Sequence, residues 1–321
     1  MAEGMQVIPR ITIPRRAFKD HTDTILAVAL FPDGHRMITS SLDQALILWD
    51  FKDGVALKKL EGHSSPVKAV AISEDGKLMA SGDANGALIA WHGVTGESLT
   101  EAITVHSDWI MSLDFSPDGT TLASGSVDKT AELWCTKTWQ VPGDPIICGE
   151  QVNCIRYSPS GDFLAIACGD ISICNPRTRE CIATLKAWAF SLTWTPDGTR
   201  LLSGGTDSNP NMREWDTLTW KQVGDHWSGH TACIYTVAIN AAGTLVASAS
   251  KDNHMRLWRP SDGRTIAIFK DTHEVVCATF SGDGRYIISG GRNTMLKEWA
   301  VPEDASLEVI DKEQMSEACL H

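Results

Sequence analysis

Residues 106–134 read HSDWIMSLDFSPDGTTLASGSVDKTAELW, and this stretch decides the fold. It holds short runs of apolar, β-branched and aromatic residues at 110–115, 121–124 and 131–134, separated by residues such as Gly, Asp and Pro. Runs of this length between turn-forming residues predict β-strands joined as hairpins. Because helical periodicity is absent from almost all of the chain, the sequence predicts an all-β protein.

The same pattern recurs along the whole chain. Four-residue turns of the SPDG type end at seven glycines spaced 37 to 45 residues apart, namely Gly34, Gly76, Gly119, Gly161, Gly198, Gly243 and Gly284. A tryptophan follows each glycine by 15 to 17 residues except in the fourth unit, where Cys174 stands near that position. A period of this length indicates a unit that buries its faces against its neighbours, and seven four-stranded units predict a β-propeller.

These units resemble WD40 repeats over about residues 10–300. The resemblance rests on a Gly-His pair that precedes a Ser or Thr by about 18 residues, with an Asp and a Trp after it. It implies a seven-bladed β-propeller of four-stranded antiparallel blades, closed by the N-terminal strand, in a single domain at 1–300. In this family the N-terminal segment completes the last blade, so we expect residues 11–18 there, which removes open sheet edges. Residues 301–321 are expected to form an acidic C-terminal tail.

His106, Ser124 and Asp128 are the residue types of a hydrolase triad. Their spacing recurs in three further units, however, and a device present in four blades is structural, since an active site is needed once. The resemblance implies hydrogen-bonded tetrads that fix each blade through a buried polar network. The predicted tetrads are His21, Thr39, Asp43 and Trp49; His63, Ser81, Asn85 and Trp91; His106, Ser124, Asp128 and Trp134; and His230, Ser248, Asp252 and Trp258. No nucleophile elbow, P-loop or HExxH motif is present, so we expect no catalytic residue and no enzyme activity.

Three units depart from the tetrad pattern. In the last unit His273 stands two residues late, and the fifth unit has Ser203, Asp207 and Trp215 but no His in register. The fifth unit also carries an insertion at 208–211. The fourth unit lacks the His, the Asp spacing and the Trp together, so we expect it to be the least regular blade.

Composition narrows the classes of partner. The net charge of −12 argues against broad nucleic-acid binding, and no apolar run approaches the roughly 18 residues that span a bilayer. Five of the nine cysteines fall in one stretch, Cys148, Cys154, Cys168, Cys174 and Cys181, but no CxxC pair occurs. We therefore expect buried thiols rather than a metal site, no cofactor, and a location in the cytoplasm, with the nucleus left open.

In the family that these units resemble, partners usually bind the narrow top face. Two residues at the start of each first strand, flanking its first core residue, point there, as does the residue before the tetrad Asp. Trp109 and Met111 bracket the core residue Ile110, and Trp188 and Phe190 bracket Ala189 in the same way. The predicted partner-binding residues are Trp109, Met111, Val127, Trp188, Phe190, Tyr235, Lys68, Lys251 and Arg292. The alternative is that the aromatic residues pack onto neighbouring loops; Trp139 and Trp220 are predicted to pack at outer strands.

Two classes of function remain open at this stage. The first is a non-catalytic protein–protein interaction scaffold that binds a peptide or protein loop on the top face, with aliphatic anchors and flanking acidic residues. The alternative is a small-molecule or glycan-binding protein that uses the same aromatic residues. We expect protein or peptide partners, no nucleic acid, no membrane, and a monomer unless the chain is part of a larger complex.

Overall fold

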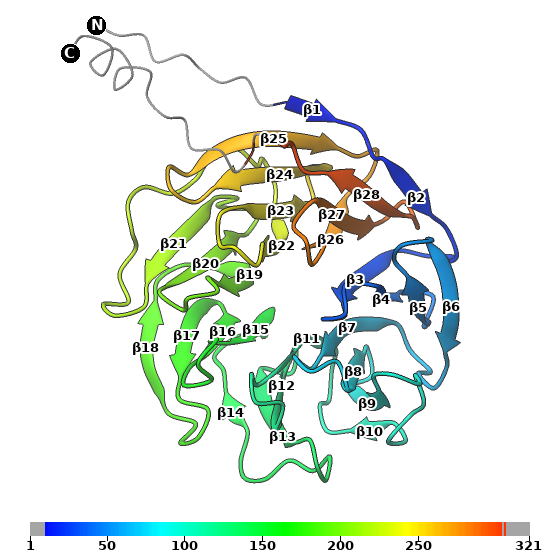
Figure 1. The fold of residues 1–321 in the computed structure, drawn as a ribbon. Coiled ribbons are helices and arrows are strands. Elements are labelled where there is room, and N and C mark those ends of the chain that lie inside the picture. The colour runs from blue at the N-terminus through cyan, green and yellow to red at the C-terminus, as the bar shows by residue number, and fades with distance from the viewer. Residues whose placement is uncertain (1–9, 304, 306–321) are drawn as a thin grey trace, which may run out of the picture.

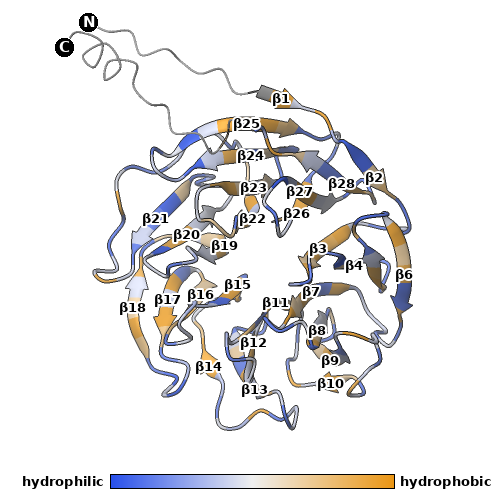
Figure 2. Cartoon of the chain, viewed as in Figure 1, coloured by the Kyte–Doolittle hydropathy of each residue, from blue (hydrophilic) through white to orange (hydrophobic). Residues whose placement is uncertain are grey.

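The computed structural model describes residues 10–303 and residue 305. Seven small sheets stand in a closed ring around a central axis (Figure 1), so the chain is a seven-bladed β-propeller, as predicted. Within these residues every regular element is a strand, and none of them forms a helix that could span a membrane. The hydrophobic residues lie mainly in the strands, and the connecting loops are mostly hydrophilic (Figure 2).

In each blade the first strand of the repeat lies nearest the axis and later strands lie further out. Blades one to four comprise β3 (Ile25–Leu30), β4 (Arg36–Ser41), β5 (Leu46–Asp50) and β6 (Val55–Leu60); β7 (Val67–Ile72), β8 (Leu78–Asp83), β9 (Ala87–His92) and β10 (Ile103–Thr104); β11 (Ile110–Phe115), β12 (Thr121–Ser126), β13 (Thr130–Cys135) and β14 (Ile146–Ile147); and β15 (Cys154–Tyr157), β16 (Leu164–Cys168), β17 (Asp170–Cys174) and β18 (Cys181–Leu185). Blades five to seven comprise β19 (Ala189–Trp194), β20 (Arg200–Gly205) and β21 (Met212–Asp216); β22 (Ile234–Ile239), β23 (Val246–Ser250), β24 (His254–Arg259) and β25 (Arg264–Lys270); and β26 (Val275–Phe280), β27 (Tyr286–Gly291) and β28 (Leu296–Ala300).

Blades pack face to face through their apolar residues. The second strands of blades two and seven carry a glycine at the contact with the next blade. A Cβ atom on Gly82 would lie 2.5 Å from the Ile110 side chain, and one on Gly290 would lie 2.6 Å from Ile25. The absent side chain lets the first core residue of the next blade seat directly on the backbone.

The N-terminal segment closes the ring, but not in one piece. β2 (Arg16–Phe18) pairs antiparallel with β28 and completes blade seven, as expected. β1 (Arg10–Thr12) pairs instead in parallel with β25 and gives blade six a fifth strand (Figure 1), so the placement of 11–18 wholly in blade seven was wrong. Pro14 lies between the two strands and has no N–H to donate to a ladder, so the pairing breaks there and the chain crosses to the neighbouring blade.

The seam of the ring is held by a buried ion pair. The Glu298 side chain on β28 is fully buried, and Arg16 Nη2 lies 2.6 Å from Glu298 Oε2. Arg16 also donates to the backbone carbonyls of Phe51 and Lys52 in blade one, at 2.9 and 2.6 Å. One side chain therefore links the last blade to the first.

The irregular blade is the fifth rather than the fourth. Its sheet has three strands, and two isolated bridges, Trp215 with Gln222 and Met212 with Trp227, stand where an outer strand would pair. Blade four has four paired strands, so the expectation of greatest irregularity there was wrong. Ile166 and Cys174 occupy its Ser and Trp positions, and these apolar residues pack without needing a hydrogen-bond partner.

Candidate functional site

The His, Ser and Asp residues of the repeats form closed networks in the interior. In blade three His106 Nε2 lies 2.7 Å from Ser124 Oγ, and His106 Nδ1 lies 3.0 Å from Asp128 Oδ2. Trp134 Nε1 donates to the same Ser124 Oγ at 2.9 Å. Equivalent contacts of 2.7 to 2.9 Å join the predicted tetrads of blades one and six.

Blade two uses a different acid from the one predicted. His63 Nδ1 lies 2.9 Å from Asp83 Oδ2, whereas Asn85 is exposed and donates its backbone N–H to Asp83 Oδ1. Asp83 occupies the position that Ser126 has in blade three, two residues after the tetrad serine, and its carboxylate reaches the imidazole from there. The assignment of Asn85 was therefore wrong. The sequence did contain a signal for Asp83, because its carboxylate is an anion that can accept several hydrogen bonds, whereas the amide of Asn85 carries no charge.

The electrostatics of the tetrads fit a structural role. Burial lowers the pKa of His106 and outweighs the neighbouring carboxylate of Asp128, so the imidazole is neutral at pH 7. Burial alone would raise the pKa of Asp128, but hydrogen bonds from Thr130, the Ser107 N–H and His106 lower it. Ser124 is fully buried and already accepts the Trp134 indole N–H, so it is closed to a substrate.

Blades five and seven lack the tetrad histidine, and their aspartates make different contacts. In blade seven Asp271 stands 18 residues before Ser289, at the histidine position, and receives Lys297 Nζ at 2.7 Å and Asn293 Nδ2 at 2.8 Å. The His273 side chain is exposed and contacts Thr272, and only the backbone N–H of His273 donates to Asp271 Oδ1, at 3.4 Å. In blade five Asp207 turns toward blade six, where it accepts the N–H of Cys233 at 2.9 Å.

A central channel of about 320 Å³ runs between the innermost strands. Of the predicted top-face residues, Lys68, Met111, Phe190 and Tyr235 line this channel. The lining does not include the others, namely Trp109, Val127, Trp188, Lys251 and Arg292. In six of the seven first strands the pairing register shifts after the first core residue, as between Ile110 and Ser112. This β-bulge directs the intervening side chain into the channel. We call the seven residues at this level the mouth ring: Leu26, Lys68, Met111, Asn153, Phe190, Tyr235 and Val276.

The aromatic residues of the top face divide into two groups. Phe190 and Tyr235 pack edge to face with ring centroids 5.9 Å apart, and Tyr235 donates its hydroxyl to Glu274 at 3.3 Å. Trp188 is 63% exposed, although Trp109 and Val127 are partly buried. Packing onto neighbouring loops therefore does not account for Trp188.

The three basic residues differ in their surroundings. Lys251 Nζ lies 2.9 Å from Asp207, and Arg292 Nε lies 3.0 Å from Glu274. Lys68 Nζ has no ion-pair or hydrogen-bond partner among residues 10–303. Burial lowers the pKa of Lys68, because the channel wall surrounds its ammonium group.

The outer tryptophans pack between neighbouring blades. Trp220 meets the rings of Phe163 and Trp194 edge on, with centroids 5.3 and 6.2 Å away. Trp139 packs against the apolar cluster between blades two and three. These contacts give both side chains a role at the outer edges of the blades.

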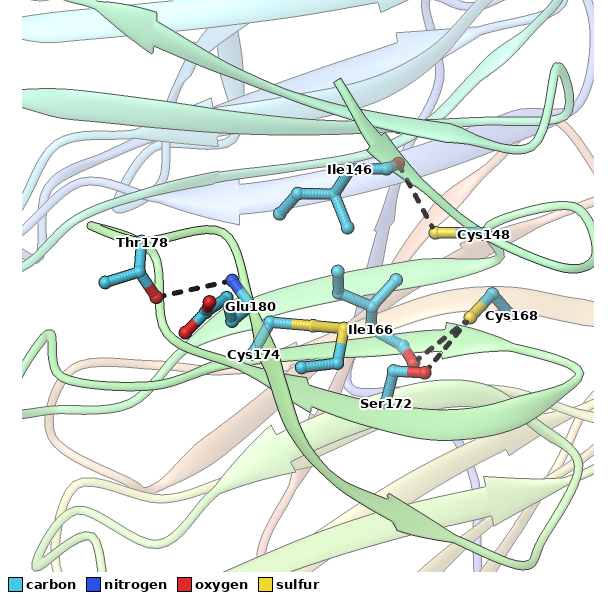
Figure 3. Close-up of a disulfide and its surroundings, with 9 residues drawn as sticks. Ile146, Cys148, Ile166, Cys168, Ser172, Cys174, Thr178 and Glu180 are labelled. Atoms are coloured by element: carbon cyan, nitrogen blue, oxygen red, sulfur yellow. Dashed lines mark hydrogen bonds between the residues drawn. A yellow bond between two sulfur atoms is a disulfide. The ribbon is translucent and has the colours of Figure 1, made fainter. Parts of the chain in front are cut away.

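The five clustered cysteines do not all remain thiols. Cys148, Cys154 and Cys168 are buried and free, as expected, but Cys174 and Cys181 form a disulfide (Figure 3). The expectation of buried thiols was wrong for both Cys174 and Cys181, because the two lie directly opposite one another in the sheet, and Cys181 is also exposed. Within the described part of the chain no three His, Cys, Asp or Glu side chains gather as a metal site would require.

Comparison with known proteins matches the chain to families of β-propellers and WD repeats. The family described as IFT122 first beta-propeller matches residues 24–209, and the WD domain, G-beta repeat family matches residues 221–259 and 263–300. Transcription factor unc-37 of Caenorhabditis elegans is 26% identical over 62% of this chain and 33% of its own length. The serine-threonine kinase receptor-associated protein of Gallus gallus is 28% identical over 54% of this chain and 49% of its own. THO complex subunit 3 of Arabidopsis thaliana is 27% identical over 60% of this chain and 76% of its own. The matches thus span between a third and a half of the first two relatives.

Proposed function

Because the chain belongs to the WD40-repeat β-propeller family, we propose that it is a non-catalytic scaffold whose top face binds an extended peptide or a loop of a protein partner. The top face is defined here as the loops that precede the innermost strands, the turns between the second and third strands, and the mouth ring. Members of this family generally act as platforms in complexes rather than as enzymes. The tetrads of this chain support the non-catalytic reading, since their serines are buried and fully bonded.

The exposure of Trp188 carries the proposal. A tryptophan that leaves 63% of its surface in water stands two residues before Phe190, which lines the channel mouth. Exposed apolar surface beside a concave opening is typical of an interaction site, and tryptophan is among the residues most often found at binding hot spots. Covering this side chain would remove a large apolar area from water, which favours association.

The named relatives point in the same direction. They are called a transcription factor, a receptor-associated protein and a subunit of a complex, which are names of proteins that work with partners. We extend that general property to this chain, and not their individual partners.

A peptide fits the top face better than a small cationic ligand. An aromatic cage for a cation needs acidic side chains that converge on the aromatic rings. Glu274 contacts the mouth ring through the Tyr235 hydroxyl that it accepts, and it already pairs with Arg292. The mouth is instead lined by Leu26, Met111 and Phe190, which suit aliphatic anchors.

The proposal is tested by comparing two variants in quantitative affinity capture from a source lysate. Trp188→Ala is expected to leave the fold intact, because the side chain is outside the core, and to lower partner capture by about thirtyfold, equivalent to roughly 2 kcal/mol. Leu218→Ala is the matched control, because Leu218 is 91% exposed in the outer turn of blade five. Equal capture by both variants, with unchanged circular dichroism, would move the binding site off the top face.

A further inference from the structure

The mouth ring offers one polar group for which residues 10–303 supply no partner. Four of its members, Leu26, Met111, Phe190 and Val276, are apolar. The two neutral polar members are already engaged: Asn153 Nδ2 donates to the Ala189 carbonyl at 3.3 Å, and the Tyr235 hydroxyl donates to Glu274. Lys68 is the remaining member, and its ammonium group has no carboxylate partner in the described chain.

The surroundings of Lys68 place its charge inside the channel rather than on the outer surface. Lys68 is only partly exposed, and it lines the channel wall. Its charge acts on thiols of blades six and seven: burial raises the pKa of Cys277 to about 12, against the opposing effect of the Lys68 ammonium. A positive charge in such a low-dielectric space attracts an anion more strongly than one in bulk water.

The other cations near the mouth are already neutralised. Lys251 pairs with Asp207 and Arg292 with Glu274, as described above. Deeper in the channel, the Arg156 guanidinium donates to the Ile155 carbonyl at 2.8 Å and to Ser112 Oγ at 3.1 Å, beside the buried carboxylate of Asp114. Among the described residues, Lys68 is therefore the cation at the channel mouth that has no acidic partner and can pair with an incoming anion.

We propose that the channel mouth accepts the carboxylate of an Asp or Glu side chain from the bound segment, with Lys68 as its counter-ion and Met111 and Phe190 against the neighbouring apolar residue. This inference rests on the proposed function and specifies the class of partner, namely an acidic extended peptide with an aliphatic or aromatic neighbour of the acid. The ligand group is a carboxylate rather than a phosphate, because a single lysine supplies one point charge, whereas phosphate groups favour several donors such as an arginine fork.

The test is selection of a random octapeptide phage library on the immobilised full chain. The unaltered protein is expected to enrich sequences with one Asp or Glu at a constant position beside an apolar residue. Lys68→Ala should lose the acidic preference, and Lys68→Glu should exchange it for Lys or Arg at that position. Lys251→Glu, which changes an exposed and already paired lysine, is the matched control and should keep the acidic preference.

A selected peptide then serves as the probe in fluorescence anisotropy. Replacing its acid by the corresponding amide should weaken binding about tenfold to the unaltered protein and leave binding to Lys68→Ala unchanged. Tighter binding of a phosphoserine version would overturn the assignment to carboxylate.

The possible failures are distinguishable. Peptides that depend on Trp188 but show no acidic preference would overturn this inference and leave the proposed function standing. Peptides that bind independently of Trp188 and Phe190, or a selection that enriches no sequence, would contradict both.

Discussion

Replacing Arg16 by Ala should open the seam of the ring. Arg16 forms the short contact to the fully buried Glu298 and two further hydrogen bonds to carbonyls of blade one. Removing one partner of a buried ion pair usually costs 3–5 kcal/mol when the other charge is left unpaired, but here Arg15 still lies 3.3 Å from Glu298. Because about a third of the Arg16 side chain reaches solvent, we expect a smaller loss, about 2 to 3 kcal/mol of the free energy of unfolding.

Urea denaturation followed by tryptophan fluorescence measures this loss. Arg15→Ala is the matched control, since Arg15 is 57% exposed and lies 3.3 Å from Glu298, and it should cost less than about 1 kcal/mol. Adding Glu298→Leu to Arg16→Ala should recover part of the loss, because the buried carboxylate that lost its closest partner is then removed. A variant Arg16→Ala that unfolds at the same urea concentration as Arg15→Ala would refute the role given to this ion pair.

Three further outcomes are expected from the geometry. Asp83→Ala should lower the free energy of unfolding, measured by urea denaturation, by about 1 to 3 kcal/mol, because Asp83 forms the hydrogen bond to His63. Asn85→Ala should lower it by less than about 0.5 kcal/mol, since the Asn85 side chain does not bond His63. Equal losses in the two variants would show that Asn85 belongs to the tetrad. The free energy of unfolding should fall as the pH is lowered from 7 to 4, because the pKa values of His21, His106 and His230 are lowered in the folded protein and the unfolded chain therefore binds more protons below pH 6.5. The pKa of Asp252, lowered from 3.8 to about 2, extends this loss below pH 4. A melting temperature that stays constant from pH 7 to pH 4 would contradict the lowered pKa values of the histidines. Reduction of the Cys174–Cys181 disulfide, which closes a short loop, should lower the free energy of unfolding by about 2 kcal/mol when unfolding is compared with and without dithiothreitol. If the variant Cys174→Ser/Cys181→Ser still loses stability in the reductant, the effect arises elsewhere.

The architecture was predictable because it depends on features repeated in every unit. The marker glycines and the tryptophans recur at a constant period, so an error in one unit, such as the missing Trp in the fourth, leaves the count of seven intact. The break at Pro14 could not be predicted in this way, because the strand with which Arg10–Thr12 pairs depends on where the neighbouring blade lies.

The site was predictable only in part, for a related reason. Met111, Phe190 and Tyr235 could be selected from the sequence because each follows the first core residue of its strand, a position that depends on each blade alone. The β-bulge that directs these side chains into the channel was visible only in the structure. The pairing of Lys251 with Asp207 and of Arg292 with Glu274 depends on which loops face one another in the folded ring, and in the first pair the partners belong to different blades. The charge that remains available at Lys68 could therefore be recognised only in three dimensions.

The pairing of β2 with β28 also has a consequence for how the chain is made on the ribosome. Residues 16–18 are synthesised early, but their partners at 296–298 follow some 280 residues later. At typical rates of translation the first strand waits about 15 to 60 s for its partner. During that interval the nascent chain presents unpaired strand edges at both ends of a growing open arc, which is the condition under which chaperones are needed. Closure of this propeller therefore waits until the last blade has left the ribosome.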